Sequence, residues 1–250
     1  MSARPAGLIT DVDGTISPIV ANPADAVVLP GCRRALAALA TKIECVAILS
    51  GRHPDVARDM LGLDGIECFG LHGMARWSAW GTTVHPEAAP FEPVVRSIIL
   101  DLDSLRACPG VVVEEKGPMF AVHYRQAPDP SLARDFLLGQ LAPLAMAAGM
   151  VLVEGRLVIE VRPPLALGKG WAITELARER ALASVVYLGD DATDIDAFEG
   201  VRTWRAEQAV RKGVAIAVAS SEMPTALAPC ADYVLASAQE VEAFLLRLAA

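Results

Sequence analysis

The order of apolar and polar segments predicts alternating strands and helices in the first part of the chain. Short apolar runs at 7–10, 43–49 and 67–70 have the length of strands. Between them, 33–39 and 53–61 carry apolar side chains at helical spacing. Because parallel strands need long crossover connections, which helices supply, this alternation predicts an α/β fold with a doubly wound, mostly parallel sheet.

The middle of the chain has a different pattern. A hairpin, two helices and three strands are predicted there, at 76–84, 91–106, 132–148, 111–116, 120–125 and 157–162. Strands and helices cluster here in a way that differs from the flanks. Residues 89–164 are therefore expected to form an α+β cap domain, inserted into a Rossmann-like core made of residues 1–88 and 165–250.

The first rhythm returns after the insertion. A helix is predicted at 169–180 and a buried strand at 184–188, and the acidic sequence Gly189 to Asp194 follows that strand. Further strands at 214–218 and 232–235 and a closing amphipathic helix at 240–248 complete the core.

Composition and charge place the chain among folded globular proteins. Of its 250 residues, 53% are hydrophobic and 21% charged, which differs from a disordered chain. The net charge of −8 argues against nucleic acid and an anionic membrane surface as partners. Five scattered cysteines without a CxxC pair indicate neither a zinc site nor a disulfide framework.

No targeting or membrane segment is expected. The first five residues lead directly into the first strand, which leaves no room for a signal peptide. The apolar run 141–153 is interrupted by Pro143 and Gly149 and is shorter than the roughly 20 residues that cross a bilayer. A cytoplasmic location without membrane contact is the expectation, and a monomer is the simplest assembly.

Candidate chemistry begins with two aspartates at the end of the first strand, Asp11 and Asp13. Residues two apart on a strand point the same way, so the two carboxylates are aimed together. Like charges this close are relieved by a cation between them or a proton on one. Gly14 lets the backbone turn and Thr15 can hydrogen-bond locally. These five residues predict a magnesium and phosphoryl-transfer site, although a solvated turn after an edge strand also fits them.

Other polar groups follow later strands or begin a helix: Ser50, Lys169, Asp190, Asp191 and Asp194. Ligands of open α/β sheets bind outside the carboxyl ends of the strands, so these residues are expected to meet there. Magnesium (Mg2+) prefers oxygen ligands. Lys169 and the hydroxyl of Ser50 would hold phosphoryl oxygens that the ion does not reach. Ser50 has a plainer alternative, the N-cap of the next helix.

This arrangement leaves Asp11 free to attack phosphorus. A carboxylate nucleophile forms an aspartyl-phosphate and divides hydrolysis into two easier steps. Asp13 would protonate the leaving sugar oxygen and then deprotonate the attacking water.

The insertion carries charged side chains in three pairs, each two residues apart on a predicted strand: Glu114 and Lys116, His123 and Arg125, Glu160 and Arg162. Members of a pair share a face of the sheet, while the alternate positions are apolar. One face rich in hydrogen-bonding groups suits a lid over a sugar. The plainer alternative is a solvated face with cross-strand ion pairs worth about 0.2–1 kcal/mol each.

Together these motifs resemble the haloacid dehalogenase superfamily of phosphotransferases, and within it the trehalose-6-phosphate phosphatase family. The four core motifs occur in order, as Asp11 to Thr15, Ser50, Lys169 and Gly189 to Asp191. The narrower likeness includes Ser50 to Arg52, His72 and Gly73, the three cap pairs with Pro163, Lys169 and Gly170, and Gly189 to Asp194.

The resemblance implies a role for each residue. Asp11 is the nucleophile, Asp13 the acid and base, and the ion is held by Asp11, the carbonyl of Asp13 and Asp190. Asp191 and Asp194 would orient the waters of the ion, with Thr15 beside them. Arg52 would bind substrate or a neighbouring carboxylate. In the resembled family, cap residues that correspond to Glu114, Lys116, Arg125 and Glu160 bind the disaccharide. His123 and Arg162 are expected on the same face of the sheet.

The expected function is therefore a magnesium-dependent phosphoric monoester hydrolase that converts trehalose 6-phosphate to trehalose and phosphate. The alternatives are a phosphatase of another glycosyl phosphate (sucrose, glucosylglycerol or glucosylglycerate type), a mutase of the same superfamily, or a non-catalytic sugar-phosphate binder. Two departures from the family pattern bear on this choice. Ile195 replaces a common acid in the last motif, and Met74-Ala75-Arg76 replaces the usual alanine and acid after His72-Gly73.

Overall fold

The computed structural model describes residues 3–20, 22–102, 105, 108–220 and 223–250. The chain divides into two compact units. Unit 1 comprises Met1–Thr83 and Leu167–Ala250, and unit 2 is Val84–Ala166.

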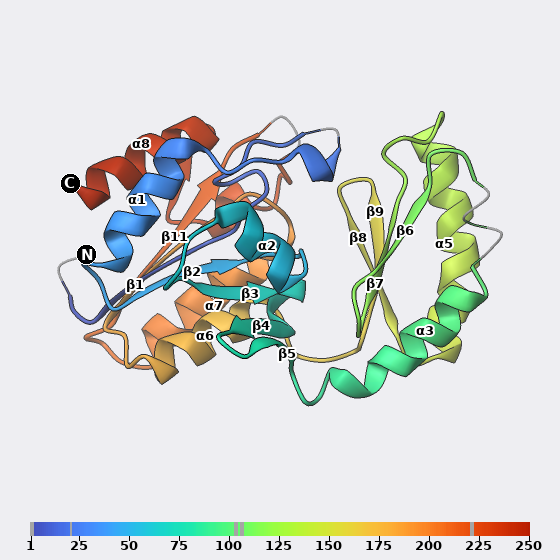
Figure 1. The fold of residues 1–250 in the computed structure, drawn as a ribbon, viewed down its shortest axis with the longest axis horizontal. Helices are drawn as coiled ribbons and strands as arrows, with labels where there is room; N and C mark the ends of the chain where they lie inside the picture. The colour runs from blue at the N-terminus through green and yellow to red at the C-terminus, as the bar shows by residue number, and fades with distance from the viewer. Residues whose placement is uncertain (1–2, 21, 103–104, 106–107, 221–222) are drawn as a thin grey trace. The chain divides into compact units, whose positions relative to one another are not determined.

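Unit 1 is built on a mostly parallel sheet with the strand order β12-β11-β10-β1-β2-β3-β4-β5 (Figure 1). The strands from β12 to β3 pair in parallel, and β4 is antiparallel to β3. The central strands β1 and β10 are buried at every position, as a parallel sheet covered on both faces requires. The strands are β1 (Ala6–Thr10), β2 (Cys45–Leu49), β3 (Glu67–Gly70), β4 (Ala75–Ser78), β5 (Gly81–Val84), β10 (Ser184–Gly189), β11 (Lys212–Val218) and β12 (Tyr233–Leu235).

Helices cover both faces of this sheet. One apolar cluster joins the sheet to α1 (Pro30–Ala40), α2 (Pro54–Leu61) and α8 (Ala238–Ala249). A second cluster on the other face joins it to α6 (Lys169–Glu179) and α7 (Thr193–Ala206), and Figure 1 shows the two helix layers. The predicted doubly wound α/β fold class is thus confirmed.

Unit 2 contains an antiparallel sheet of strand order β6-β7-β9-β8 with two helices. Its elements are α3 (Glu92–Leu100), β6 (Val112–Glu115), β7 (Phe120–His123), α5 (Pro130–Ala147), β8 (Val151–Gly155) and β9 (Val158–Arg162). One face of the sheet packs on both helices, through residues such as Phe120, Ile159 and Val161. Figure 1 shows α3 and α5 on the same side of this sheet. Short 3-10 helices lie at Pro23–Asp25, Leu71–Gly73, Ala89–Phe91 and Ala228–Cys230.

Two elements are absent from the sequence prediction. Strand β8 begins within the apolar run 141–153. In that run α5 ends at Ala147, and Gly149, with φ +66°, turns the chain before Val151. Helix α7 begins among acidic residues, which hid its apolar face. That face is formed by Ala197, Phe198, Val201 and Trp204, which have helical spacing.

Some element ends also differ. The helix predicted at 91–106 is helical over Glu92–Leu100, and residues 103–104 and 106–107 of that prediction lie outside the described part. Among the described residues, no helix combines the length and the apolar character that a bilayer span needs.

Candidate active site

Three neighbouring strands of unit 1 bring their carboxyl ends together. β1 pairs with β10 on one side and with β2 on the other. Asp11 directly follows β1, and its amide donates to the carbonyl of Leu188 in β10 at 2.8 Å. Ser50 follows β2, and Asp190 follows β10. Parallel pairing therefore places the predicted catalytic residues at one edge of the sheet.

Lys169 is the only described lysine that is paired with Asp11. Its Nζ lies 3.0 Å from Asp11 Oδ1 and 2.7 Å from Asp194 Oδ1, and the lysine is 2% exposed. Burial alone would lower the pKa of Lys169, but the two carboxylates raise it above its ordinary value. The ammonium group is therefore charged. Burial also raises the pKa of Asp11, an effect that Lys169 opposes and Asp194 and Asp190 reinforce.

Asp194, at the start of α7, is fully buried and accepts hydrogen bonds on both oxygens. Oδ1 accepts from Lys169 Nζ at 2.7 Å and from the Tyr187 hydroxyl at 2.6 Å. Oδ2 accepts from the amides of Asp190 and Asp191, each at 2.8 Å. One carboxylate thus fixes both the lysine and the loop that follows β10.

Asp190 is fully buried beside the turn after β1. Its Oδ1 accepts from the Thr15 hydroxyl at 3.1 Å. Gly14 has φ +80°, and a Cβ there would lie 1.9 Å from Asp190 Oδ2. Glycine is required at this position both for the backbone conformation and for the close approach of the carboxylate.

Close contact between α6 and α7 holds the backbone around Lys169. The amide of Gly170 donates to Asp196 Oδ2 at 2.8 Å, which satisfies a donor of the first turn of α6. A Cβ on Gly200 would lie 2.5 Å from the Cα of Gly170, so the two helices approach at bare backbone. Lys169 is thereby fixed through its side chain and through its helix.

Asp13 is paired with Arg52 in a two-pronged contact. Arg52 Nε donates to Asp13 Oδ2 at 2.6 Å, and Nη2 donates to Oδ1 at 2.8 Å. The same guanidinium donates to the carbonyl of Pro23 at 2.8 Å. Of the two expectations for Arg52, the structure shows the contact with a neighbouring carboxylate. The Oγ of Ser50 accepts from the amide of Arg52 at 3.2 Å, and α2 begins later, at Pro54.

The chemistry of this donor set suits a metal ion. Oxygens of Asp11, Asp190 and Asp194 lie within 4.8 Å of one another, all three residues are buried, and a hard divalent cation prefers such oxygens. Asp194 already accepts four hydrogen bonds, so Asp11 and Asp190 are the carboxylates better placed to hold an ion.

Unit 2 gathers most of its predicted site residues on one face of its sheet. Glu114 and Glu160 flank Ala121 in register. Lys116 Nζ lies 3.4 Å from Glu114 Oε2 and 3.8 Å from Glu160 Oε1. His123 Nε2 lies 2.8 Å from Glu114 Oε2, and Arg162 pairs with Glu160. We call this set the cap network: Glu114, Lys116, His123, Glu160 and Arg162.

Electrostatics and position distinguish members of this face. Burial alone would raise the pKa of Glu114, but the hydrogen bond with His123 and the charge of Lys116 lower it below its ordinary value. Arg125 lies beyond the end of β7 and donates to the carbonyl of Arg156 at 3.4 Å. The structure thus joins five of the six residues predicted for this face, and Arg125 follows the end of β7.

Comparison with known proteins identifies the family. The family model for trehalose-phosphatase matches residues 9–236. The chain belongs to the trehalose-phosphatase family. It is 41% identical over 209 residues to a trehalose-phosphate phosphatase of Mycobacterium marinum, an alignment that covers 79% of this chain and 52% of the relative.

A second relative is an uncharacterised glycosyl hydrolase of Mycobacterium tuberculosis, 35% identical over 81% of this chain and 16% of its own length. The chain thus spans about half the length of the matched trehalose-phosphate phosphatase, and less of this larger protein. The C-terminal domain of a trehalose-6-phosphate phosphatase from C. albicans has a TM-score of 0.79 at 23% identity, covering 99% of this chain and 92% of that domain. This likeness concerns the fold.

The two departures from the family pattern have clear surroundings within unit 1. Ala75 begins β4 opposite Gly70. Arg76 is held by two glutamates, 2.9 Å from Glu67 and 2.8 Å from Glu179. Ile195 packs against the apolar cluster between the sheet and the helices α6 and α7. The chain thus uses Arg76 and Ile195 for contacts inside unit 1.

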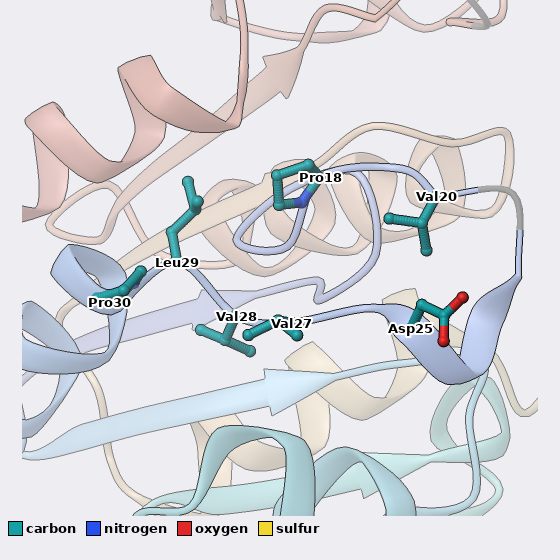
Figure 2. Close-up of a pocket in the computed structure, with 7 residues that line it drawn as sticks. All are labelled: Pro18, Val20, Asp25, Val27, Val28, Leu29 and Pro30. Carbon is teal, nitrogen blue, oxygen red and sulfur yellow. The ribbon is translucent and has the colours of Figure 1, made fainter.

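A pocket of about 260 Å³ lies in the segment between β1 and α1. Its lining is apolar except for Asp25, which lies at the opposite end from Pro30 in Figure 2. The other lining residues are Pro18, Val20, Val27, Val28 and Leu29. It includes none of the acidic residues of the site.

Sequence reasoning missed two contacts of the site. The hydroxyl of Tyr187 lies in a mostly apolar strand, and the signal for it is the one aromatic hydroxyl of that strand, three residues before Asp190. The helix contact of Asp196 could have been suspected from its position two residues after Asp194, in the first turn of α7.

Proposed function

We propose that this chain is a magnesium-dependent phosphatase that hydrolyses trehalose 6-phosphate to trehalose and phosphate. The observation that carries the proposal is the buried contact of Lys169 with Asp11 at the ends of β1 and α6, in a member of the trehalose-phosphatase family. The chain spans about half the length of the matched phosphatase, so the activity of that relative is not assigned to this chain and is stated here as a proposal.

In the proposed reaction a carboxylate oxygen of Asp11 attacks phosphorus, and the bond from phosphorus to the sugar oxygen breaks. Asp13 gives a proton to that oxygen, and the sugar leaves. Asp13 then takes a proton from water, which attacks phosphorus, releases phosphate and restores Asp11. Dividing the reaction in this way requires an ionised Asp11.

Several groups would keep Asp11 ionised and bind the phosphoryl oxygens. The charged Lys169 contacts Asp11 directly and opposes the effect of burial on its pKa. Lys169 and the Ser50 hydroxyl would donate to phosphoryl oxygens. A magnesium ion held by Asp11, Asp190 and the Asp13 carbonyl would add positive charge that stabilises the buried carboxylates and the transferring phosphoryl group. Thr15 and Asp194 fix the surroundings of these ligands.

Unit 2 would supply recognition of the sugar. The cap network combines carboxylate acceptors with ammonium, guanidinium and imidazole groups, and sugar hydroxyls can use both kinds. We include Arg125 as a further donor at the edge of this face. In this proposal Val84–Ala166 is a cap domain that selects the disaccharide, while unit 1 carries out phosphoryl transfer.

A phosphatase for another glycosyl phosphate is the nearest alternative, because Ala75 stands where the resembled family commonly has an acid. A panel of substrates separates the two. Phosphate release is measured from trehalose, sucrose and glucose 6-phosphates and from phosphorylated glucosylglycerol and glucosylglycerate, with and without a chelator. We expect trehalose 6-phosphate to have the highest kcat/KM and the chelator to abolish turnover. Equal rates for trehalose and glucose 6-phosphates would refute the proposed substrate.

A further inference from the structure

We infer that Tyr187 is a positioning residue for the phosphatase reaction, which acts through Asp194 to hold Lys169 toward the phosphoryl group. This inference rests on the proposed function. Tyr187 lies in β10, three residues before Asp190, and its side chain is fully buried. In the part of the chain that the structure describes, no hydrogen bond joins Tyr187 to Asp11 or Asp13.

The geometry forms a chain of hydrogen bonds. The Tyr187 hydroxyl donates to Asp194 Oδ1 at 2.6 Å, the same oxygen accepts from Lys169 Nζ at 2.7 Å, and Nζ lies 3.0 Å from Asp11 Oδ1. An ammonium group has three hydrogens, so two are directed at carboxylates and the third is available for a phosphoryl oxygen. The direction of the third depends on how the first two are held.

The Tyr187 hydroxyl provides a second side-chain donor to Asp194 Oδ1. Without it, Lys169 would be the sole side-chain donor to Asp194 Oδ1 among the described residues, because the two backbone amides bond Oδ2. A buried carboxylate oxygen with one donor would draw the ammonium more strongly, away from the phosphoryl oxygen. The hydroxyl therefore shares the charge of Asp194 and leaves Lys169 able to respond to substrate.

The ring of Tyr187 has a separate packing role that allows a clean test. It lies edge-to-face with Phe198, with ring centroids 6.0 Å apart and an interplanar angle of 71°. Phenylalanine keeps this ring and removes only the hydroxyl. Tyr187→Phe therefore separates the hydrogen bond from the packing.

The experiment measures kcat, KM and the inhibition constant for orthovanadate, a transition-state mimic, with p-nitrophenyl phosphate and magnesium present. We expect Tyr187→Phe to lower kcat by about tenfold with little change in KM, because the contact of Lys169 strengthens in the transition state. Orthovanadate should bind more weakly by a similar factor. If Tyr187 had a structural role alone, Tyr187→Phe would lower the fraction of enzyme that is folded and active, and the inhibition constant for orthovanadate would stay unchanged.

A double-mutant cycle provides the second arm. Tyr187→Phe placed on Asp194→Asn should change kcat by less than about twofold, because the route through Asp194 is already lost. Tyr124→Phe, which removes a hydroxyl from a buried tyrosine of unit 2, is the matched control and should leave kcat unchanged. An unchanged kcat and inhibition constant in Tyr187→Phe, or equal losses in both backgrounds, would overturn the inference. Inactive wild type on sugar phosphates, with p-nitrophenyl phosphate still hydrolysed, would instead refute only the proposed substrate.

Discussion

The polar residues of the two units are held in contrasting ways. In unit 1, Lys169, Asp190 and Asp194 are at most 2% exposed, and strands and helices fix them through backbone amides and buried side chains. In unit 2, the side chains of Glu114 and His123 are 46% and 31% exposed, and members of the cap network hold one another.

This difference has a physical consequence for function. Glu114 and His123 form a partly exposed pair, and such pairs are worth about 0–1 kcal/mol, so these two side chains can exchange their contact for sugar hydroxyls at little cost, whereas Lys116 and Glu160 of the same network are buried. Buried charges cannot be rearranged so cheaply, which keeps the geometry of unit 1 fixed before substrate arrives. Fixed groups suit phosphoryl transfer, and exchangeable groups suit the selection of a sugar.

The largest effect is expected at the proposed nucleophile. Asp11→Asn removes the attacking carboxylate while keeping the size of the side chain, and we expect kcat to fall by roughly four orders of magnitude or more. Phosphate release under saturating substrate measures this loss. Asp59→Asn, at a side chain that is 66% exposed, is the control and should match wild type. A rate within tenfold of wild type for Asp11→Asn would exclude Asp11 as nucleophile.

Lys169→Met should be the next most damaging change. It removes the cation between Asp11 and Asp194, and we expect kcat to fall by about 10²–10³-fold. Two buried carboxylates would also lose their partner, which lowers the free energy of unfolding by about 3–5 kcal/mol. Enzyme kinetics and urea unfolding measure the two effects. Lys212→Met, at an exposed lysine of β11, should show neither, and a stable, active Lys169→Met protein would contradict the description of the site.

Arg52→Lys is expected to have an intermediate effect. Lysine keeps the charge but not the two-pronged contact with Asp13. If Arg52 orients Asp13, kcat should fall by about tenfold with KM unchanged. General acid–base catalysis by a positioned group contributes a rate factor of about 10²–10⁴, so a tenfold loss corresponds to a part of that factor. A higher KM at constant kcat would show instead that Arg52 binds the substrate in both ground and transition states.

The smallest effect concerns the acid stability of unit 2. The pKa of Glu114 is lowered from an ordinary 4.5, so its contribution to stability is present above that value and is lost as pH falls through the lowered one. Glu114→Gln should cost less than about 1 kcal/mol at pH 7, and the difference from wild type should shrink below pH 4.5.

Urea midpoints at several pH values measure this loss, with the exposed Glu87→Gln as control. A difference between Glu114→Gln and wild type that grows as the pH falls would contradict the assigned sign.

Much of the fold could be predicted from sequence because its elements have clean periodicity. The buried strand ending at Gly189 and the helices α1, α2 and α6 follow this pattern. Strand β8 was missed because its first residues continue the apolar run of α5, and the turn at residues 148–150, which includes Gly149 with a positive φ, separates the two elements. Helix α7 was missed because the buried Asp194 and the exposed Asp196 occupy its first turn, where their tertiary contacts replace apolar periodicity.

The candidate site was predictable as far as short motifs fix it. The strand-end positions of Asp11, Ser50 and Asp190 follow from parallel pairing. The hydrogen bonds that Asp194 accepts from Lys169 and from the Tyr187 hydroxyl depend on distances between side chains, which no sequence spacing specifies. The pairing of Arg52 with Asp13 likewise depends on a distance between side chains.

The most direct test of the division between the units compares two substrates in one variant, Lys116→Met. Lys116 contacts both glutamates of the cap network, whereas p-nitrophenyl phosphate has no sugar to bind there. The account predicts that kcat/KM for trehalose 6-phosphate falls by about tenfold or more, as expected for losing a charged hydrogen-bonding group, while that for p-nitrophenyl phosphate stays within about twofold. An equal fall in kcat/KM for both substrates would contradict the proposal that unit 2 selects the sugar and unit 1 carries out phosphoryl transfer.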